Sequence, residues 1–458
     1  MENQPTRGRG LRRGLLVLTV PDLLLAAAAM LLCYVSFAYS DLYVTGNRAW
    51  LLYNNGLLDF YDASYRWAGN YGANYMPSVF WLYGIWNLPL RLATGFPEMV
   101  TTNSLLCNLW YKALPVLFYG GAAVLVYRIA RGMGLPEKTA RIASLSFAFS
   151  PLAVFSQFIF SQQDIFAVFF MLLGIRCDQQ DKRLAFLLLF GVSFTFKYYT
   201  LPAFLIFLLL KEKRPLRVIG CGLVSALPFL AEYLLYRRSD GFQKGVFGFG
   251  MLGAVQQSAM STHLGVFNLG QMLYLFLVAW AYFVEAPSEK ERFAWALYLN
   301  CGVAFAMFGI STFNPQWILL AVPFWALSQT INRRREIFLW LECLLAPVFY
   351  FLVAHAWYGA VDDAMLEGGI WKYLYDQSQN DFHLYDLYGG DAAILLSVFV
   401  VVLLVWFVFA HPRQAIDSYA LADAQTPSPW LYRLRFAAGP VLYMGLAFLT
   451  LAKRMTAL

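Results

Sequence analysis

Long stretches of apolar residues recur along this chain, and several approach the roughly 20 residues that a helix needs to cross a lipid bilayer. Residues 392–410, for example, read AAILLSVFVVVLLVWFVFA, without one charged side chain. Of the 458 residues, 60% are hydrophobic and 13% are charged, whereas soluble domains carry about 25% charged residues. The sequence therefore predicts an all-α, polytopic membrane protein.

Lysine and arginine predict the orientation of the spans, because they collect in short cytoplasmic loops. On this rule the N-terminus at 1–14 and the basic loops at 128–141, 211–217 and 333–335 are cytoplasmic. We then expect about 11–13 spans in one membrane domain, near 15–39, 109–127, 142–158, 164–177, 184–196, 200–210, 218–236, 266–284, 295–312, 317–328, 337–357, 392–410 and 437–452. Extracytoplasmic loops are expected at 41–106, 237–265 and 358–391, and a cytoplasmic linker at 411–435.

Two apolar stretches need separate treatment. The first run begins after four arginines and lacks a small-residue cleavage site, so we expect a retained span, not a cleaved signal peptide. The stretch PSVFWLYGIWNLPLRL, at 77–92, is predicted to form an interfacial or re-entrant helix, because counting it as a span would put the basic loop 128–141 outside.

Several kinds of site are not indicated. The six cysteines are scattered, and neither they nor the four histidines have the spacing of metal ligands. The net charge of +7 is explained by basic cytoplasmic loops, and no long basic arm suggests a nucleic acid partner. We therefore expect no disulfide framework and no nucleic acid partner, and a divalent metal is not indicated, although the sequence leaves it open.

Asp41 directly follows the first apolar run, in YSDLY, at the root of a long loop rich in aromatic and amide side chains. It could be an ordinary solvated charge at a helix end. The functional alternative is a sugar site, in which rings pack on sugar faces and amides bind hydroxyl groups. A carboxylate placed there can act as the general base that deprotonates an acceptor hydroxyl.

Lys197 stands in FTFKYYTLP, between two short apolar segments. One interpretation is a lysine that extends from the bilayer toward the interface. The other is a phosphate site, because an ammonium ion beside tyrosine hydroxyls can hold a lipid phosphate. Lys112 and Tyr198 are further candidates for this phosphate contact.

The remaining polar candidates lie on the same predicted side of the membrane. Asp164 is either a helix N-cap or a site residue, and Asn314 with Pro315 makes a turn. Charges near membrane depth are costly and tend to line cavities. The expected substrate-positioning residues are Asp164, Gln163, Gln316, Tyr75, Asp62 and His263. Asp59 and Asp62 can equally be turn residues, and the acidic loop 358–391 is expected to be a solvated cover.

The order of these motifs resembles the glycosyltransferase-C superfamily, in particular the catalytic subunit of GPI mannosyltransferase I and bacterial polyprenyl-phosphate-mannose-dependent mannosyltransferases. The resemblance covers about residues 35–330, and six short motifs carry it: YSDLY, NYMPSVFW, LWYKALPVLFY, FSQQDIFAVFFMLLGI, FKYYTLPAFL and FNPQWILLAVP. The chain departs from the family at Tyr43, where a second acid is usual.

The resemblance implies an inverting hexosyltransferase, with mannose the first choice of sugar. Its donor would be a polyprenyl-phosphate sugar, and its acceptor a lipid-linked or envelope glycan. Asp41 would be the base, and Lys197, Lys112 and Tyr198 would bind the donor phosphate. The expected setting is a bacterial plasma membrane with the active site on the extracytoplasmic face, among membrane lipids and with room for a small accessory subunit.

Two other functions compete with this one. A transporter or lipid-saccharide flippase would also bind polar groups within a helical bundle. Transporters often carry internal repeats and midplane sites, whereas this sequence shows no repeat and its polar residues gather toward one face. A non-catalytic scaffold would need neither Asp41 nor Lys197.

Overall fold

The structure of this chain is a computed structural model, and it describes residues 18–69, 72–94, 104–248, 259–262, 265–311, 314–356, 368–373, 382–425 and 427–456. Helices make up most of these residues. The strands in the described part are β1 (Ala259–Thr262) and β2 (Gly265–Asn268), which pair as an antiparallel hairpin. The prediction that the chain is mainly helical is confirmed for the described residues.

The N-terminal quarter contains four helices: α1 (Val20–Ser36), α2 (Ser40–Arg48), α3 (Leu51–Ala68) and α4 (Pro77–Thr94). Thr19 begins α1 with a capping box that also involves Asp22. We predicted one span near 15–39, but α1 ends at Ser36 and meets α2 at an angle of 65°. Asp41 therefore lies in the first turn of α2, beyond the bend.

The next segment is a series of helices of different lengths. Its elements are α5 (Leu105–Gly132), α6 (Glu137–Ala148), α7 (Pro151–Val154), η2 (Phe155–Ile159), α8 (Asp164–Asp178), α9 (Arg183–Phe196), η3 (Tyr198–Thr200), α10 (Leu201–Lys211), α11 (Pro215–Tyr236), α12 (Asp240–Phe242) and η4 (Gln243–Phe247). The expected short pair of segments around Lys197 is present as α9 and α10.

The C-terminal half completes the bundle. After the hairpin come α14 (Leu269–Phe283), α15 (Glu289–Ala304), η5 (Phe305–Ser311), η6 (Pro315–Leu320), α16 (Val322–Ile331), α17 (Arg335–Ala356), η7 (Ile370–Tyr373), η8 (Leu384–Leu387), α19 (Ala392–Phe409), η9 (Pro412–Gln414), η10 (Tyr419–Gln425), α20 (Pro429–Ala438) and α21 (Pro440–Thr456). The predicted linker 411–435 differs from the structure at its end, because α20 starts within it and Arg435 is buried.

By length and composition, five described helices can cross a membrane, and up to eight spans result if each bent pair counts as one. The bent pairs are α1 with α2, the 137–148 helix with 151–159, and α20 with α21. Several long apolar helices thus indicate a multi-pass integral membrane protein. Three shorter apolar helices, at 183–196, 198–211 and 269–283, fall below that length and account for part of the difference from the predicted 11–13 spans.

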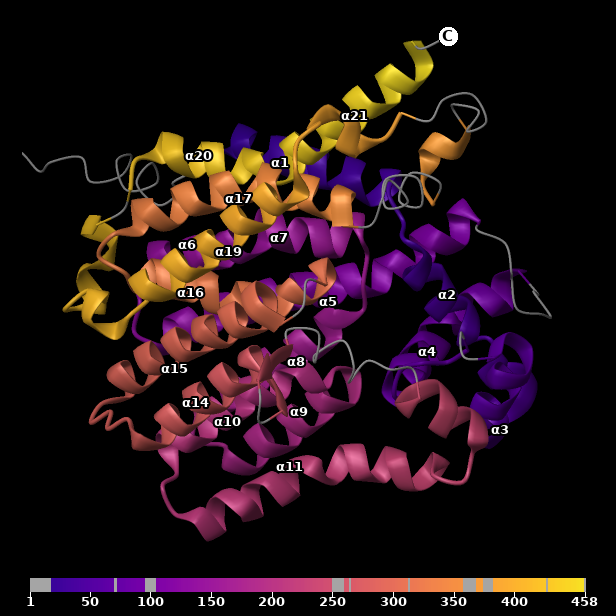
Figure 1. The fold of residues 1–458 in the computed structure, drawn as a ribbon, viewed down its shortest axis with the longest axis horizontal. Coiled ribbons are helices and arrows are strands. Elements are labelled where there is room, and N and C mark those ends of the chain that lie inside the picture. The colour runs from indigo at the N-terminus through magenta and orange to yellow at the C-terminus, as the bar shows by residue number, and fades with distance from the viewer. Residues whose placement is uncertain are drawn as a thin grey trace, which may run out of the picture.

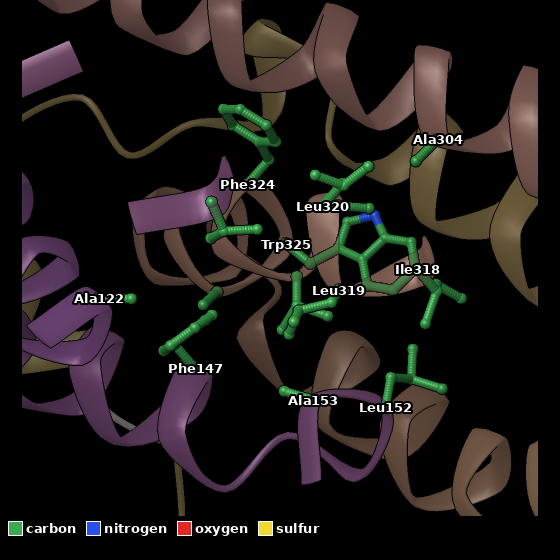
Figure 2. Packing of buried hydrophobic residues seen from close by; sticks show 14 of the residues in the cluster. Ala122, Phe147, Leu152, Ala153, Ala304, Ile318, Leu319, Leu320, Phe324 and Trp325 are labelled. Carbon is green, nitrogen blue, oxygen red and sulfur yellow. The ribbon is translucent and has the colours of Figure 1, made fainter. Parts of the chain in front are cut away.

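Many of the helices lie side by side in a bundle (Figure 1). Helices α1, α20 and α21 run along one edge, α11 runs along the opposite edge, and α2, α3 and α4 gather at one end. In the interior, Ile318 and Leu319 of η6 pack with Leu152 and Ala153 of α7 (Figure 2). This core anchors the segment that also carries Gln316 and Trp317.

Part of the acidic loop 358–391 packs on the bend between α1 and α2. The amide of Asn108 donates to the carbonyl of Gly368 at 2.9 Å. A side chain at Gly368 or Gly369 would collide with the backbone of Ala38 or Ser36, so glycine permits this close approach. We expected a solvated cover, but Gly368 and Gly369 are buried against the bend between α1 and α2.

Candidate functional site

A buried ion pair lies where the turn between α9 and α10 meets the start of α8. The ammonium of Lys197 is 3.0 Å from the carboxylate of Asp164, and both side chains are almost completely buried. Lys197 follows α9, and Asp164 opens α8 in the acidic first-turn position that the helix dipole favours. Neither Asp164 oxygen nor the Lys197 ammonium has a well-directed hydrogen bond to any described residue. The pair therefore retains hydrogen-bonding capacity for a ligand.

Three aromatic rings surround the ammonium of Lys197. Its Nζ is 5.1 Å from the ring centroid of Tyr75, 5.5 Å from that of Trp317 and 5.9 Å from that of Tyr199. Such rings stabilise a cation through their electron-rich faces. Burial raises the pKa of Tyr75 well above its usual range, and the carboxylates of Asp41 and Asp164 raise it further, so Tyr75 stays a neutral phenol.

Asp41 belongs to the same group of charges. It is half-buried, and its Oδ2 accepts a hydrogen bond from the Nε2 of Gln162. It lies close enough to both Lys197 and Asp164 for their charges to interact with its own. The structure thus brings together Asp41, Asp164 and Lys197, and no third His, Cys, Asp or Glu joins the two carboxylates as a metal-ligand group among the described residues.

The turn that delivers Gln162 and Asp164 has an uncommon backbone. Ser161 has a φ of 65°, in the left-handed region that residues other than glycine rarely adopt. It separates the π-helix η2 from α8, and such local deviations are frequent at functional sites.

Buried amide groups without partners accompany this turn. Both side-chain polar atoms of Gln157 and of Gln163 lack a hydrogen-bond partner within the described residues, as does Oε1 of Gln316. A buried polar group left unpaired costs about 1–3 kcal/mol. Gln157 lies in η2, Gln163 just before α8, and Gln316 in η6, on which both η2 and α8 pack, so these groups are available to bind a polar ligand or water.

A cavity of about 250 Å³ opens beside Lys197. Its walls come from the segment before α4, the α9–α10 turn, α11 and η4. Most lining groups are apolar, and Lys197 is the charged residue among them; the full lining is Asn74, Tyr75, Met76, Phe194, Thr195, Phe196, Lys197, Tyr198, Phe229, Val246 and Phe247. The cavity can therefore take an apolar chain that ends in an anion.

Tyr198, Asp62 and His263 are three further predicted site residues. Tyr198 is 39% exposed, lines the cavity, and its hydroxyl contacts that of Tyr199. Asp62 accepts the backbone N–H of Gly241 at 2.7 Å and joins α3 to α12, which is a structural role. His263 lies outside the described residues.

Lys112 does not belong to the charged cluster. Its Nζ lies within hydrogen-bond distance of the carbonyl oxygens of Cys33, Tyr34, Phe37 and Phe158. It is fully buried. Carbonyls at the end of a helix lack partners within the helix, and a lysine can supply them. Lys112 thus holds the end of α1 to η2, and we do not retain it as a phosphate ligand.

We predict that Lys112→Met lowers thermal stability and leaves the affinity for a phosphate ligand unchanged. Each carbonyl left without a partner costs about 1–3 kcal/mol. The matched control is Lys213→Met, because Lys213 binds the carbonyls of Leu209, Ala281, Tyr282 and Val284 in the same way at the end of α14. Melting curves in detergent should show a similar decrease for both variants. Weaker phosphate binding by Lys112→Met at unchanged stability would restore Lys112 to the site.

Two further polar residues near the site, Gln157 and Glu232, were not predicted from the sequence. Gln157 was visible in the sequence, because SQFIFSQQ repeats a Ser-Gln pair on either side of the turn. Glu232 was visible as an acid within the apolar run of α11, and an ionisable residue in a span is a candidate for function. Its side chain is 6% exposed and bonds to Ser78, which follows the cavity-lining residues Tyr75 and Met76.

Comparison with known proteins adds no assignment, since no protein-family model and no curated protein matches this chain.

Proposed function

We propose that this chain is an inverting membrane glycosyltransferase that resembles the glycosyltransferase-C superfamily, with 11–13 spans and its active site on the extracytoplasmic face of a bacterial plasma membrane. The observation that carries the proposal is the buried ion pair of Lys197 with Asp164 beside an apolar cavity that Lys197 lines, with Asp41 in electrostatic range of both. This reaction needs two charged groups: a carboxylate that can accept a proton and a cation that can hold a phosphate.

The donor is a hexose, with mannose the first choice, carried on a polyprenyl phosphate. The cavity is suited to the first part of the lipid chain, since most of its lining side chains are apolar. Lys197 holds the phosphate, and Tyr198 at the cavity wall can add a hydrogen bond. The rings of Tyr75 and Trp317 and the unpaired amides of Gln163 and Gln316 then face the sugar.

The chemical step forms one bond and breaks one. The hydroxyl oxygen of a lipid-linked or envelope glycan bonds to the anomeric carbon of the donor sugar from the side opposite the phosphate. The bond between that carbon and the phosphate oxygen breaks, and the polyprenyl phosphate leaves with the electron pair. Asp41 takes the hydroxyl proton, and Lys197 stabilises the charge that develops on the phosphate. Attack from the opposite side inverts the anomeric configuration.

To test this proposal, the purified full-length protein is placed in lipid nanodiscs with an envelope-glycan acceptor. Mannose, glucose and arabinose, each carried on polyprenyl phosphate, are then supplied as donors. Mass spectrometry should detect one sugar added to the acceptor, together with free polyprenyl phosphate. The variant Lys197→Met should raise the KM for the donor, by about ten- to a hundredfold if one charged hydrogen bond is lost. Binding of labelled donor without covalent product would instead indicate a transporter or flippase.

A further inference from the structure

Glu232 is a carboxylate on α11, an outer helix whose surface is mostly exposed. Glu232 is an exception to that exposure, because its side chain is 6% exposed and faces the bundle. Placing an ionisable group inside a membrane span is costly, so its contacts indicate why it is there.

Glu232 hydrogen-bonds to Ser78, the second residue of α4, and it also interacts with the hydroxyl of Thr195 on α9. The backbone N–H of Ser78 donates to Oε2 at 3.3 Å, and the hydroxyl of Ser78 donates to Oε1. The free N–H groups at a helix start favour a negative charge, so the carboxylate caps α4.

The hydroxyl of Ser78 continues this connection into a third helix. Its Oγ lies 2.8 Å from the Oγ1 of Thr195, near the end of α9. Glu232, Ser78 and Thr195 thus form one chain of hydrogen bonds across α11, α4 and α9. Because networks of this kind are strong when every member is bonded, they fix the separation of the helices that they join.

Ser78 and Thr195, the two hydroxyl members of this chain, lie beside two walls of the cavity. Ser78 follows Tyr75 and Met76, which line the cavity on one side. Thr195 lines it on the other side and precedes Lys197 by two residues. Glu232 therefore stands behind the cavity and ties the wall that carries Tyr75 to the wall that carries Lys197.

We propose that Glu232 is a positioning residue that sets the spacing between Tyr75 and Lys197 and thereby the affinity of the cavity for a polyprenyl phosphate. This inference rests on the proposed function. Glu232 need not contact the lipid, because it acts through Ser78 and Thr195. Its loss should weaken ground-state binding of the lipid phosphate more than it slows the chemical step.

The experiment measures the Kd of the full-length protein for a fluorescent short-chain polyprenyl phosphate, together with KM and kcat. Glu232→Gln keeps the volume of the side chain but replaces one acceptor oxygen by a donor, so Ser78 loses one of its two bonds. We expect Kd and KM to rise about tenfold and kcat at saturating donor to stay within about twofold of wild type. Ser78→Ala should behave alike, and the double variant should be no weaker than either single one, because both act on one connection.

The control is Glu212→Gln, which changes the glutamate just before the other end of α11, where Glu212 pairs with Arg183. It should leave Kd unchanged. An unchanged Kd in both Glu232→Gln and Ser78→Ala would overturn the positioning role while leaving the proposed function standing. A lower binding capacity with an unchanged Kd would also overturn it, since that pattern reports unfolded protein. A wild-type protein that neither binds the lipid phosphate nor transfers sugar would overturn both proposals.

Discussion

Asp41→Asn is expected to insert and fold like the wild type and to lose sugar transfer. The amide keeps the size of the side chain and can still pair with Gln162 by presenting its oxygen to the Nε2 of that residue. It has no basic oxygen to take a proton from the acceptor hydroxyl. Removing a general base lowers kcat by about a hundredfold to ten-thousandfold.

The measurement pairs single-turnover transfer with donor binding. Since Lys197 and the cavity are intact in Asp41→Asn, we expect the Kd for the donor to stay close to the wild-type value while kcat falls. Asp59→Asn is the matched control, because Asp59 belongs to the same predicted loop but forms an exposed ion pair with Arg66 at 2.7 Å. Near wild-type turnover by Asp41→Asn would remove Asp41 from the base role.

The position of Asp41 illustrates what the sequence can predict. Its charge stands out because the preceding run is apolar, and the same contrast reveals Lys197 and Asp164. Rare charges in apolar surroundings are costly and therefore informative. The long helices were predictable for a related reason, since residues 335–356 and 392–409 have the length and composition of spans.

The bend before Asp41 was not predictable in this way. The apolar run continues through residues 37–39 without a proline or glycine, so nothing local indicates an end of α1 at Ser36. The carbonyls at that end are bound by Lys112, which comes from a distant helix. The partners of Lys112 are backbone atoms, which no residue pattern reveals. The sequence therefore suggested a phosphate ligand at this position.

The amide groups of the site were only partly predictable. Glutamine carries no charge, and in sequence Gln157 differs little from a residue on a solvated turn. Burial makes Gln157 notable, together with the lack of hydrogen-bond partners within the described residues, and both depend on how η2 packs against η6. Whether such an amide is buried and has a hydrogen-bond partner depends on the tertiary structure, which a single sequence does not show.

A second large effect is expected in stability, at the ion pair between α17 and α20. Arg435 donates to both carboxylate oxygens of Glu342, with 2.8 Å between its Nη2 and Oε1, and both side chains are buried. Glu342 also accepts from the hydroxyl of Ser150 at 3.2 Å, and Arg435 donates to the carbonyl of Ser146. The pair thus joins the C-terminal helices to α17 and to the segment around α6.

Glu342→Ala should destabilise the protein by about 3–5 kcal/mol, because it leaves the buried guanidinium of Arg435 without its counter-charge. The free energy of unfolding in mixed micelles, or the melting temperature where unfolding is irreversible, measures this loss. Arg433→Met is the control, since Arg433 pairs with Asp22 at the surface and should change stability by less than about 1 kcal/mol.

The double variant Glu342→Leu with Arg435→Met separates the charge from the packing. It removes both charges and refills most of their volume, and such replacements of a buried pair are often neutral or stabilising. We therefore expect it to recover most of the stability that Glu342→Ala loses, because the large cost of the single variant comes from one uncompensated charge. A double variant as unstable as Glu342→Ala would show instead that the hydrogen bonds to Ser146 and Ser150 hold α20 in place.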